Sequence, residues 1–152
     1  MLYRISMPTV KGTLAMKAAP KSRARTVLLV EDNTQLLTLA REMLEERGYT
    51  VLVAKDGDSA LQLAAQHRGG IDVLVTDVVM PGLSGPRLAA KLAALRSGLR
   101  VLFMSGLVQE ASLKDAMSSR TDFLPKPFTA SHLIEKIEAL LHPAAQDSSP
   151  LS

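Results

Sequence analysis

The sequence predicts an α/β fold in which a doubly wound parallel sheet carries helices on both faces. Two observations lead to this prediction. Five short runs of mostly Val and Leu are spaced along the chain, and amphipathic stretches fill the gaps between them. Near-continuous apolar runs are typical of strands buried on both faces, as in a parallel sheet. Strict alternation of strand and helix places the helices on the two faces of one sheet.

Each apolar run has the length and composition of a buried strand. The predicted strands are TVLLV (26–30), TVLVA (50–54), DVLVT (72–76), RVLFM (100–104) and DFL (122–124). Five strands in one parallel sheet need helical crossovers between them.

The gaps contain helical patterns. In the first, apolar residues from Leu36 to Leu44 recur at i, i+1, i+4, i+7 and i+8, and Gly48 is suited to end that helix. Residues 133–141 repeat the spacing, with Thr129 or Ser131 as N-cap and Pro143 as a stop. Three further helices are expected over 58–67, 86–96 and 107–119, of which the last has the weakest pattern.

Charge divides the chain of 152 residues into a basic tail and a mildly acidic domain. Residues 1–25 contain six of the 18 basic side chains and no acidic one, which leaves 12 basic against 15 acidic residues in the rest. We expect a disordered tail over 1–25, one domain over 26–142, and a polar, disordered tail over 143–152. Because the positive charge belongs to the tail, a nucleic-acid-binding domain is not expected.

Composition excludes several classes of protein. The chain has no Cys, so a disulfide scaffold, a thiolate zinc site and a Cys nucleophile are ruled out. The chain has no run of about 18 apolar residues, the length needed to cross a membrane. Its first 25 residues lack the apolar core of a secretory signal. A cytoplasmic location is therefore the default expectation.

Charged or hydroxyl side chains stand at the carboxyl ends of four predicted strands. Glu31 and Asp32 follow the first strand, Asp77 the third, Ser105 the fourth, and Lys126 the fifth after one Pro. Functional groups of open α/β sheets gather at this edge, near the point where the strand order reverses. Three converging carboxylates would repel one another, so cations must share the site. Lys126 supplies one charge, and Mg²⁺, which accepts carboxylates, waters and phosphate oxygens, is the favoured second.

Four motifs in this order resemble the receiver domain of two-component response regulators. They are VLLVEDN (27–33), VTDVVMPGLSG (75–85), FMSG (103–106) and LPKPF (124–128), and the resemblance runs from about Thr26 to Leu141. It implies a flavodoxin-like sheet with strand order 2-1-3-4-5.

The resemblance also implies residue roles. Asp77 is the phosphoacceptor, which takes a phosphoryl group from a phosphohistidine of a partner sensor histidine kinase or histidine phosphotransfer protein. Asp32 binds Mg²⁺ directly, with Glu31 nearby or acting through water, and the backbone carbonyl of Val79 completes the protein ligands. Lys126 pairs with the phosphoryl oxygens, and Ser105 donates a hydrogen bond to one of them. Such roles suit phosphoryl transfer, which depends on positioning and charge neutralisation.

Phe123 matches the family's switch aromatic. When Ser105 moves toward the phosphoryl group, the ring is expected to turn inward and to change the surface formed by the last two helices and the fifth strand. Phosphorylation would thereby create a binding face for a downstream protein target. A homodimer through the same face is possible.

Val79 departs from the family pattern, in which the second residue after the phosphoacceptor is often polar or acidic. Its side chain cannot orient an attacking water, so we expect slow loss of phosphate from Asp77. The same departure weighs against an aspartyl phosphatase, which would need a second acid at this position.

Three roles remain open within the fold. The leading hypothesis is a single-domain receiver that signals by protein contact and is not an enzyme, since no output domain follows residue 142. The alternatives are a phosphorelay shuttle or the receiver module of a hybrid sensor kinase, and a receiver-like adaptor that acts without phosphorylation. The complete acidic set argues against the adaptor.

Overall fold

The computed structural model describes residues 24–106 and 120–142, and these residues form five strands and four helices. The elements are Thr26–Val30 (β1), Thr34–Glu46 (α1), Thr50–Ala54 (β2), Gly57–Gln66 (α2), Val73–Asp77 (β3), Gly85–Leu95 (α3), Arg100–Ser105 (β4), Thr121–Pro125 (β5) and Ala130–Leu141 (α5). All five predicted strands are present, and the first two have the predicted bounds. The helix predicted over 107–119, most of the N-terminal tail and the C-terminal tail lie outside the described residues.

The five strands form one parallel sheet in the order β2-β1-β3-β4-β5. This order confirms the flavodoxin-like arrangement predicted above. β1 pairs with both β2 and β3, so the chain first adds a strand on one side of β1 and then builds outward on the other. The reversal lies between β1 and β3, and the carboxyl ends of these two strands meet there.

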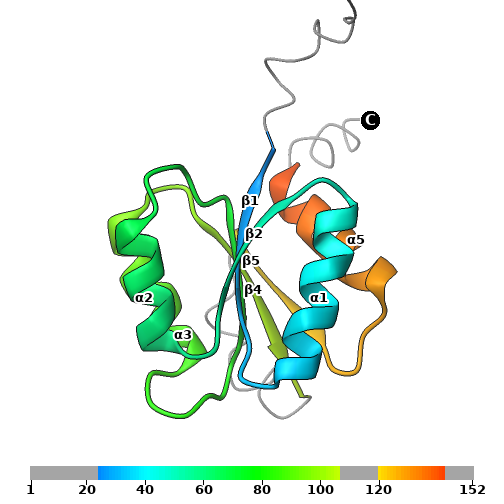
Figure 1. The fold of residues 1–152 in the computed structure, drawn as a ribbon, viewed down its shortest axis with the longest axis horizontal. Coiled ribbons are helices and arrows are strands. Elements are labelled where there is room, and N and C mark those ends of the chain that lie inside the picture. Colours follow the sequence, from blue (N-terminus) through cyan, green and yellow to red (C-terminus); the bar gives the residue numbers. More distant parts are fainter. Residues whose placement is uncertain (1–23, 107–119, 143–152) are drawn as a thin grey trace, which may run out of the picture.

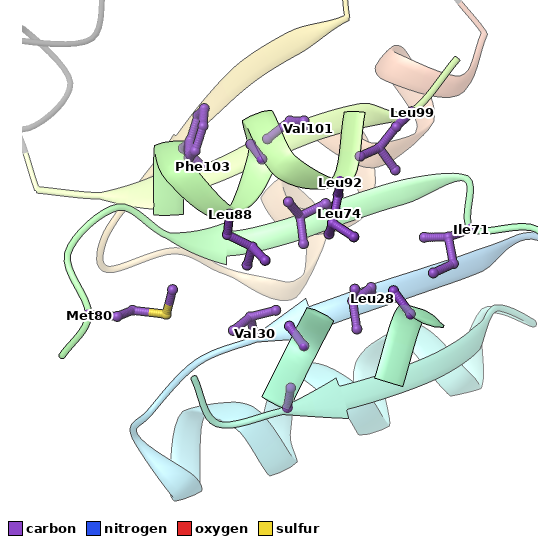
Figure 2. Close-up of a cluster of buried hydrophobic side chains, with 14 of the residues drawn as sticks. Leu28, Val30, Ile71, Leu74, Met80, Leu88, Leu92, Leu99, Val101 and Phe103 are labelled. Carbon is purple, nitrogen blue, oxygen red and sulfur yellow. The ribbon is translucent and has the colours of Figure 1, made fainter. Parts of the chain in front are cut away.

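Helices cover both faces of the sheet: α1 and α5 lie on one face, and α2 and α3 on the other (Figure 1). Alternate residues of each central strand point to opposite faces. In β1, Leu28 and Val30 join the cluster under α2 and α3, whereas Val27 and Leu29 join the cluster under α1 and α5. Figure 2 shows part of the first cluster, in which Leu88 and Leu92 of α3 face the sheet.

The expectation that every strand is buried on both faces is correct for β1 and β3 and wrong for β2. All five residues of β1 and of β3 are buried. In β2, Thr50 is exposed and Val51, Leu52 and Val53 are only partly buried. β2 is an edge strand, so one side of it lacks a neighbour and the helices cover it incompletely.

Local signals explain where the helices begin and end. The side chain of Asn33 accepts a hydrogen bond from the Leu36 amide and starts α1, and Thr129, one of the two predicted caps, starts α5. After α1, Gly48 adopts a φ of 94° and donates to the carbonyl of Glu45, while the Tyr49 amide donates to Leu44. This glycine-terminated ending confirms the predicted stop.

None of the helices in the described part of the chain has the length and apolarity needed to cross a membrane.

Candidate functional site

The carboxyl edge of the sheet brings together the side chains that the sequence predicted there. Glu31 follows β1 directly, and Lys126 follows β5. Asp77 and Ser105 are the last residues of β3 and β4, where the predicted strands stopped one residue earlier. The strands run further because Asp77 still pairs with Met104, and Ser105 with Pro125.

Glu31, Asp32 and Asp77 form a carboxylate cluster. One oxygen from each lies within 4.8 Å of the others, so all three could contact one ion. Glu31 and Asp77 are buried, whereas Asp32 is exposed. Hard oxygen donors of this kind suit a divalent cation such as Mg²⁺, with Asp32 on the side open to water.

Lys126 ties two of these carboxylates together. Its Nζ lies 2.6 Å from Oδ1 of Asp77 and donates a 3.1 Å hydrogen bond to Oε1 of Glu31. Burial disfavours the ammonium, but the hydrogen bonds and charges of the two carboxylates outweigh burial and raise the pKa of Lys126. The lysine therefore carries its charge into the site at neutral pH.

One ammonium does not neutralise two buried carboxylates. Burial, followed by the charge of Asp77, raises the pKa of Glu31 to about 7, although the Asn33 amide at 2.9 Å and Lys126 both favour the charged form. The remaining negative charge is an electrostatic reason for a second cation at this edge. The donor set of this chain therefore fits the Mg²⁺ that the sequence predicted.

The hydroxyl of Ser105 is buried and has no hydrogen-bond partner among the described residues. A cavity of about 260 Å³ is lined by Ser105 together with Asp32, Asp77 and Lys126. A buried hydroxyl without a partner is costly, and an acceptor within this cavity would satisfy it.

Val79 and Phe123 occupy very different environments. Val79 lines the same cavity and is 65% exposed, an unusual position for a valine. Phe123 is buried, and its ring packs against Phe103, the opposite residue of β4, with centroids 5.8 Å apart. The structure thus shows Phe123 in the inward position, and its rotation as a switch stays a prediction.

Sequence reasoning missed some of the cavity wall. Val78 and Met104 line it beside the predicted residues. Both are chain neighbours of site residues, which was the available signal, but their apolar side chains suggested only core packing. The peptide bond between Lys126, which also lines the cavity, and Pro127 is cis.

A family model described as "Response regulator receiver domain" matches residues 27–138. Among curated proteins, the sensor kinase CckA of Brucella abortus is 35% identical over 126 residues, which cover 82% of this chain and 13% of that one. The response regulator MprA of Mycobacterium sp. (strain KMS) is 32% identical over 132 residues, covering 82% of this chain and 54% of that one. The chain thus spans about half, or much less, of the length of these relatives.

Solved structures of similar proteins have the same fold. The receiver domain of the hybrid histidine kinase CckA is 36% identical with a TM-score of 0.67, covering 77% of this chain and 99% of that one. A response regulator receiver domain protein from Clostridium thermocellum is 25% identical with a TM-score of 0.72, covering 80% and 98%.

Proposed function

The chain belongs to the response regulator receiver family, and from this premise we propose that Asp77 accepts a phosphoryl group from a phosphohistidine of a sensor histidine kinase or histidine phosphotransfer protein. The observation that carries the proposal is the position of Asp77. Its carboxylate is buried at the end of β3, contacts Lys126 at 2.6 Å and lines a cavity beside the hydroxyl of Ser105, which has no partner among the described residues.

The proposed step is an in-line transfer. A carboxylate oxygen of Asp77 forms a bond to phosphorus as the bond between phosphorus and the donor imidazole nitrogen breaks, and that nitrogen keeps the electron pair. Lys126 moves its hydrogen bonds from the carboxylates toward the phosphoryl oxygens, and Ser105 donates to one of them. These groups neutralise charge that the transferring phosphoryl group brings into the site.

Glu31, Asp32, Asp77 and the backbone carbonyl of Val79 would hold Mg²⁺ in this proposal. The ion would supply charge neutralisation for the phosphoryl oxygens. The carboxylate oxygens within 4.8 Å of one another, together with the excess negative charge around Lys126, support this assignment.

The output in this proposal is a protein contact. Movement of Ser105 toward the phosphoryl group, followed by rotation of Phe123, would change the surface around β5 and α5 and recruit a downstream protein target. In this role the chain is a cytoplasmic phosphoacceptor rather than an enzyme with turnover of its own, and a homodimer through the same face is compatible with it. Phe123 packs against Phe103, which lies two residues before Ser105 on β4, and this proximity supports their coupling.

Intact-mass spectrometry tests the chemistry. The chain is incubated with a small acyl-phosphate donor and Mg²⁺, beside Asp77→Asn and a chelator control. One phosphoryl adduct that requires both Mg²⁺ and Asp77 is the expected result. A folded chain that forms no adduct and binds no Mg²⁺ would favour a receiver-like adaptor that acts without phosphorylation.

A second role has a specific observation in its favour. The similarity to the sensor kinase CckA, and to the receiver domain of the hybrid kinase of that name, suggests the receiver module of a hybrid kinase or a phosphorelay shuttle. A transfer assay separates the roles. A shuttle passes its phosphoryl group on to a histidine phosphotransfer protein within the lifetime of the acyl phosphate, whereas a terminal receiver retains it until hydrolysis.

A further inference from the structure

The first turn of α3 lies directly against the main chain of Asp77. Gly85 is buried at the first position of this helix, and its amide donates a 2.9 Å hydrogen bond to the carbonyl of Val78. Ser84 precedes it as N-cap, and its side chain accepts from the Arg87 amide. The helix start is therefore fixed to the residues around the proposed phosphoacceptor.

The contact leaves no room for a side chain at residue 85. A Cβ on Gly85 would overlap the carbonyl oxygen of Asp77 and would lie 3.0 Å from its carbonyl carbon and 3.1 Å from Cα of Val78. These atoms belong to the backbone, so no rotamer change can relieve the overlap. To reach ordinary contact distances of about 3.5 Å, the Asp77 peptide or the helix start must move by on the order of 1 Å.

The Asp77 carbonyl is also held from its own strand. The hydroxyl of Thr76, which is fully buried, donates to this oxygen at 3.0 Å. One side of the peptide is thus hydrogen-bonded and the other is packed against Gly85. The carboxylate that contacts Lys126 projects from the residue whose peptide is held in this way.

We propose that Gly85 is a positioning residue for Asp77. Because Gly85 has no side chain, the start of α3 can hold the Asp77 peptide where its carboxylate contacts Lys126. This inference rests on the proposed function of Asp77. Misplacement of a reacting group by about 1 Å can cost about 10²-fold in rate. Gly85→Ala should therefore strongly lower the rate of phosphorylation, while the chain keeps its fold.

The chain offers a matched control. Gly57 is likewise a buried first residue, of α2, and follows the N-cap Asp56. A Cβ there would be 2.8 Å from Cβ and 2.9 Å from Cδ2 of Leu83, a loop side chain, and no atom of Asp77 is among its three nearest. Gly57→Ala thus introduces the same methyl group at the same helix position, with a milder conflict against a side chain and away from the phosphoacceptor.

The experiment compares three full-length chains: the unsubstituted protein, Gly85→Ala and Gly57→Ala. Phosphorylation rates are measured by intact mass at saturating Mg²⁺ with a small acyl-phosphate donor, and ¹H–¹⁵N NMR spectra report the amides of Asp77 and Val78. We expect Gly85→Ala to be about 10²-fold slower and to shift both amides, and Gly57→Ala to leave rate and amides essentially unchanged.

Other results overturn the inference. The inference is wrong if a folded Gly85→Ala chain has the parental phosphorylation rate and unshifted amides. It is also wrong if both variants lose phosphorylation rate equally. If Gly85→Ala is unfolded, the spectra are repeated in concentrated sucrose, which favours the folded state. Failure to fold even there makes Gly85 a requirement of the fold and contradicts a positioning role. If the unsubstituted chain takes up no phosphoryl group, the proposed function fails, while the amide shifts still decide whether Gly85 positions Asp77.

Discussion

Ser105→Ala should make the unmodified chain more stable, although it removes a polar group from the proposed site. Ser105 is 4% exposed, and its hydroxyl has no partner among the described residues. A buried hydroxyl without a hydrogen bond costs about 1–3 kcal/mol. Loss of one oxygen leaves a hole of roughly 10 Å³, which at about 24 cal/mol per Å³ costs only about 0.2 kcal/mol.

The balance is a gain of about 1 kcal/mol or more in the free energy of unfolding. For a domain of this size that gain corresponds to a rise in Tm of roughly 3–6 °C. Phosphorylation should reverse the sign. In the modified protein, Ser105 would donate to a charged phosphoryl oxygen, a bond worth about 1.5–3 kcal/mol, and the variant would lack it.

The assay is urea unfolding followed by circular dichroism, on chains with and without the phosphoryl group. Ser84→Ala is the matched control, because the same substitution there removes the N-cap of α3 and should lower stability by about 0.5–2 kcal/mol. The reasoning is refuted if Ser105→Ala lowers the stability of the unmodified chain, since the hydroxyl must then be satisfied within the fold.

Three further predictions concern other features of the molecule. Val79→Asn should speed hydrolysis of phospho-Asp77 by about tenfold or more, because a polar side chain beside the cavity can orient water; phosphate release at an unchanged rate contradicts this role. Arg96→Ala should lower the free energy of unfolding by about 2 kcal/mol, since its guanidinium donates to the carbonyls of Ala64, His67 and Gly69, whereas the exposed Arg87→Ala should have little effect in the same urea titration. The pKa of Glu31 is raised from 4.5 to about 7, so the folded chain binds this proton more tightly than the unfolded chain; the contribution of Glu31 is present below about pH 4.5 and is lost as the pH rises through 7. The urea midpoint of the parent chain should therefore fall between pH 5 and 8, and Glu31→Gln should make this fall smaller. A parent chain whose midpoint does not fall would show that Lys126 keeps the Glu31 carboxylate charged.

Most of the fold followed from local patterns in the sequence. The apolar runs at 26–30 and 50–54 are strands with the predicted bounds, and Gly48 and Thr129 end and begin helices as predicted. These features depend on residues close in the chain, where periodicity and capping chemistry act. The uneven burial of β2 was not predictable from its composition, because burial depends on whether a neighbouring strand lies beside it.

The candidate site was predictable as a set of residues and not as a geometry. The order of motifs indicated that Glu31, Asp77, Ser105 and Lys126 share one edge of the sheet. The distances between them depend on how strands far apart in sequence pack together. For example, Lys126 and Glu31 are 95 positions apart in the chain, yet Nζ of Lys126 lies 3.1 Å from Oε1 of Glu31.

The sequence alone determined which chemical groups reach the edge of the sheet, because strand ends and motif order are local properties. Only the tertiary structure decided their electrical and steric state. Burial and the charge of Asp77 raise the pKa of Glu31, and the neighbouring strands enclose the hydroxyl of Ser105. The packing of α3 leaves only the space of a hydrogen atom between Gly85 and the Asp77 carbonyl. Solvent exclusion and contact distance arise from all the elements that surround an atom, so no single segment of the chain encodes them.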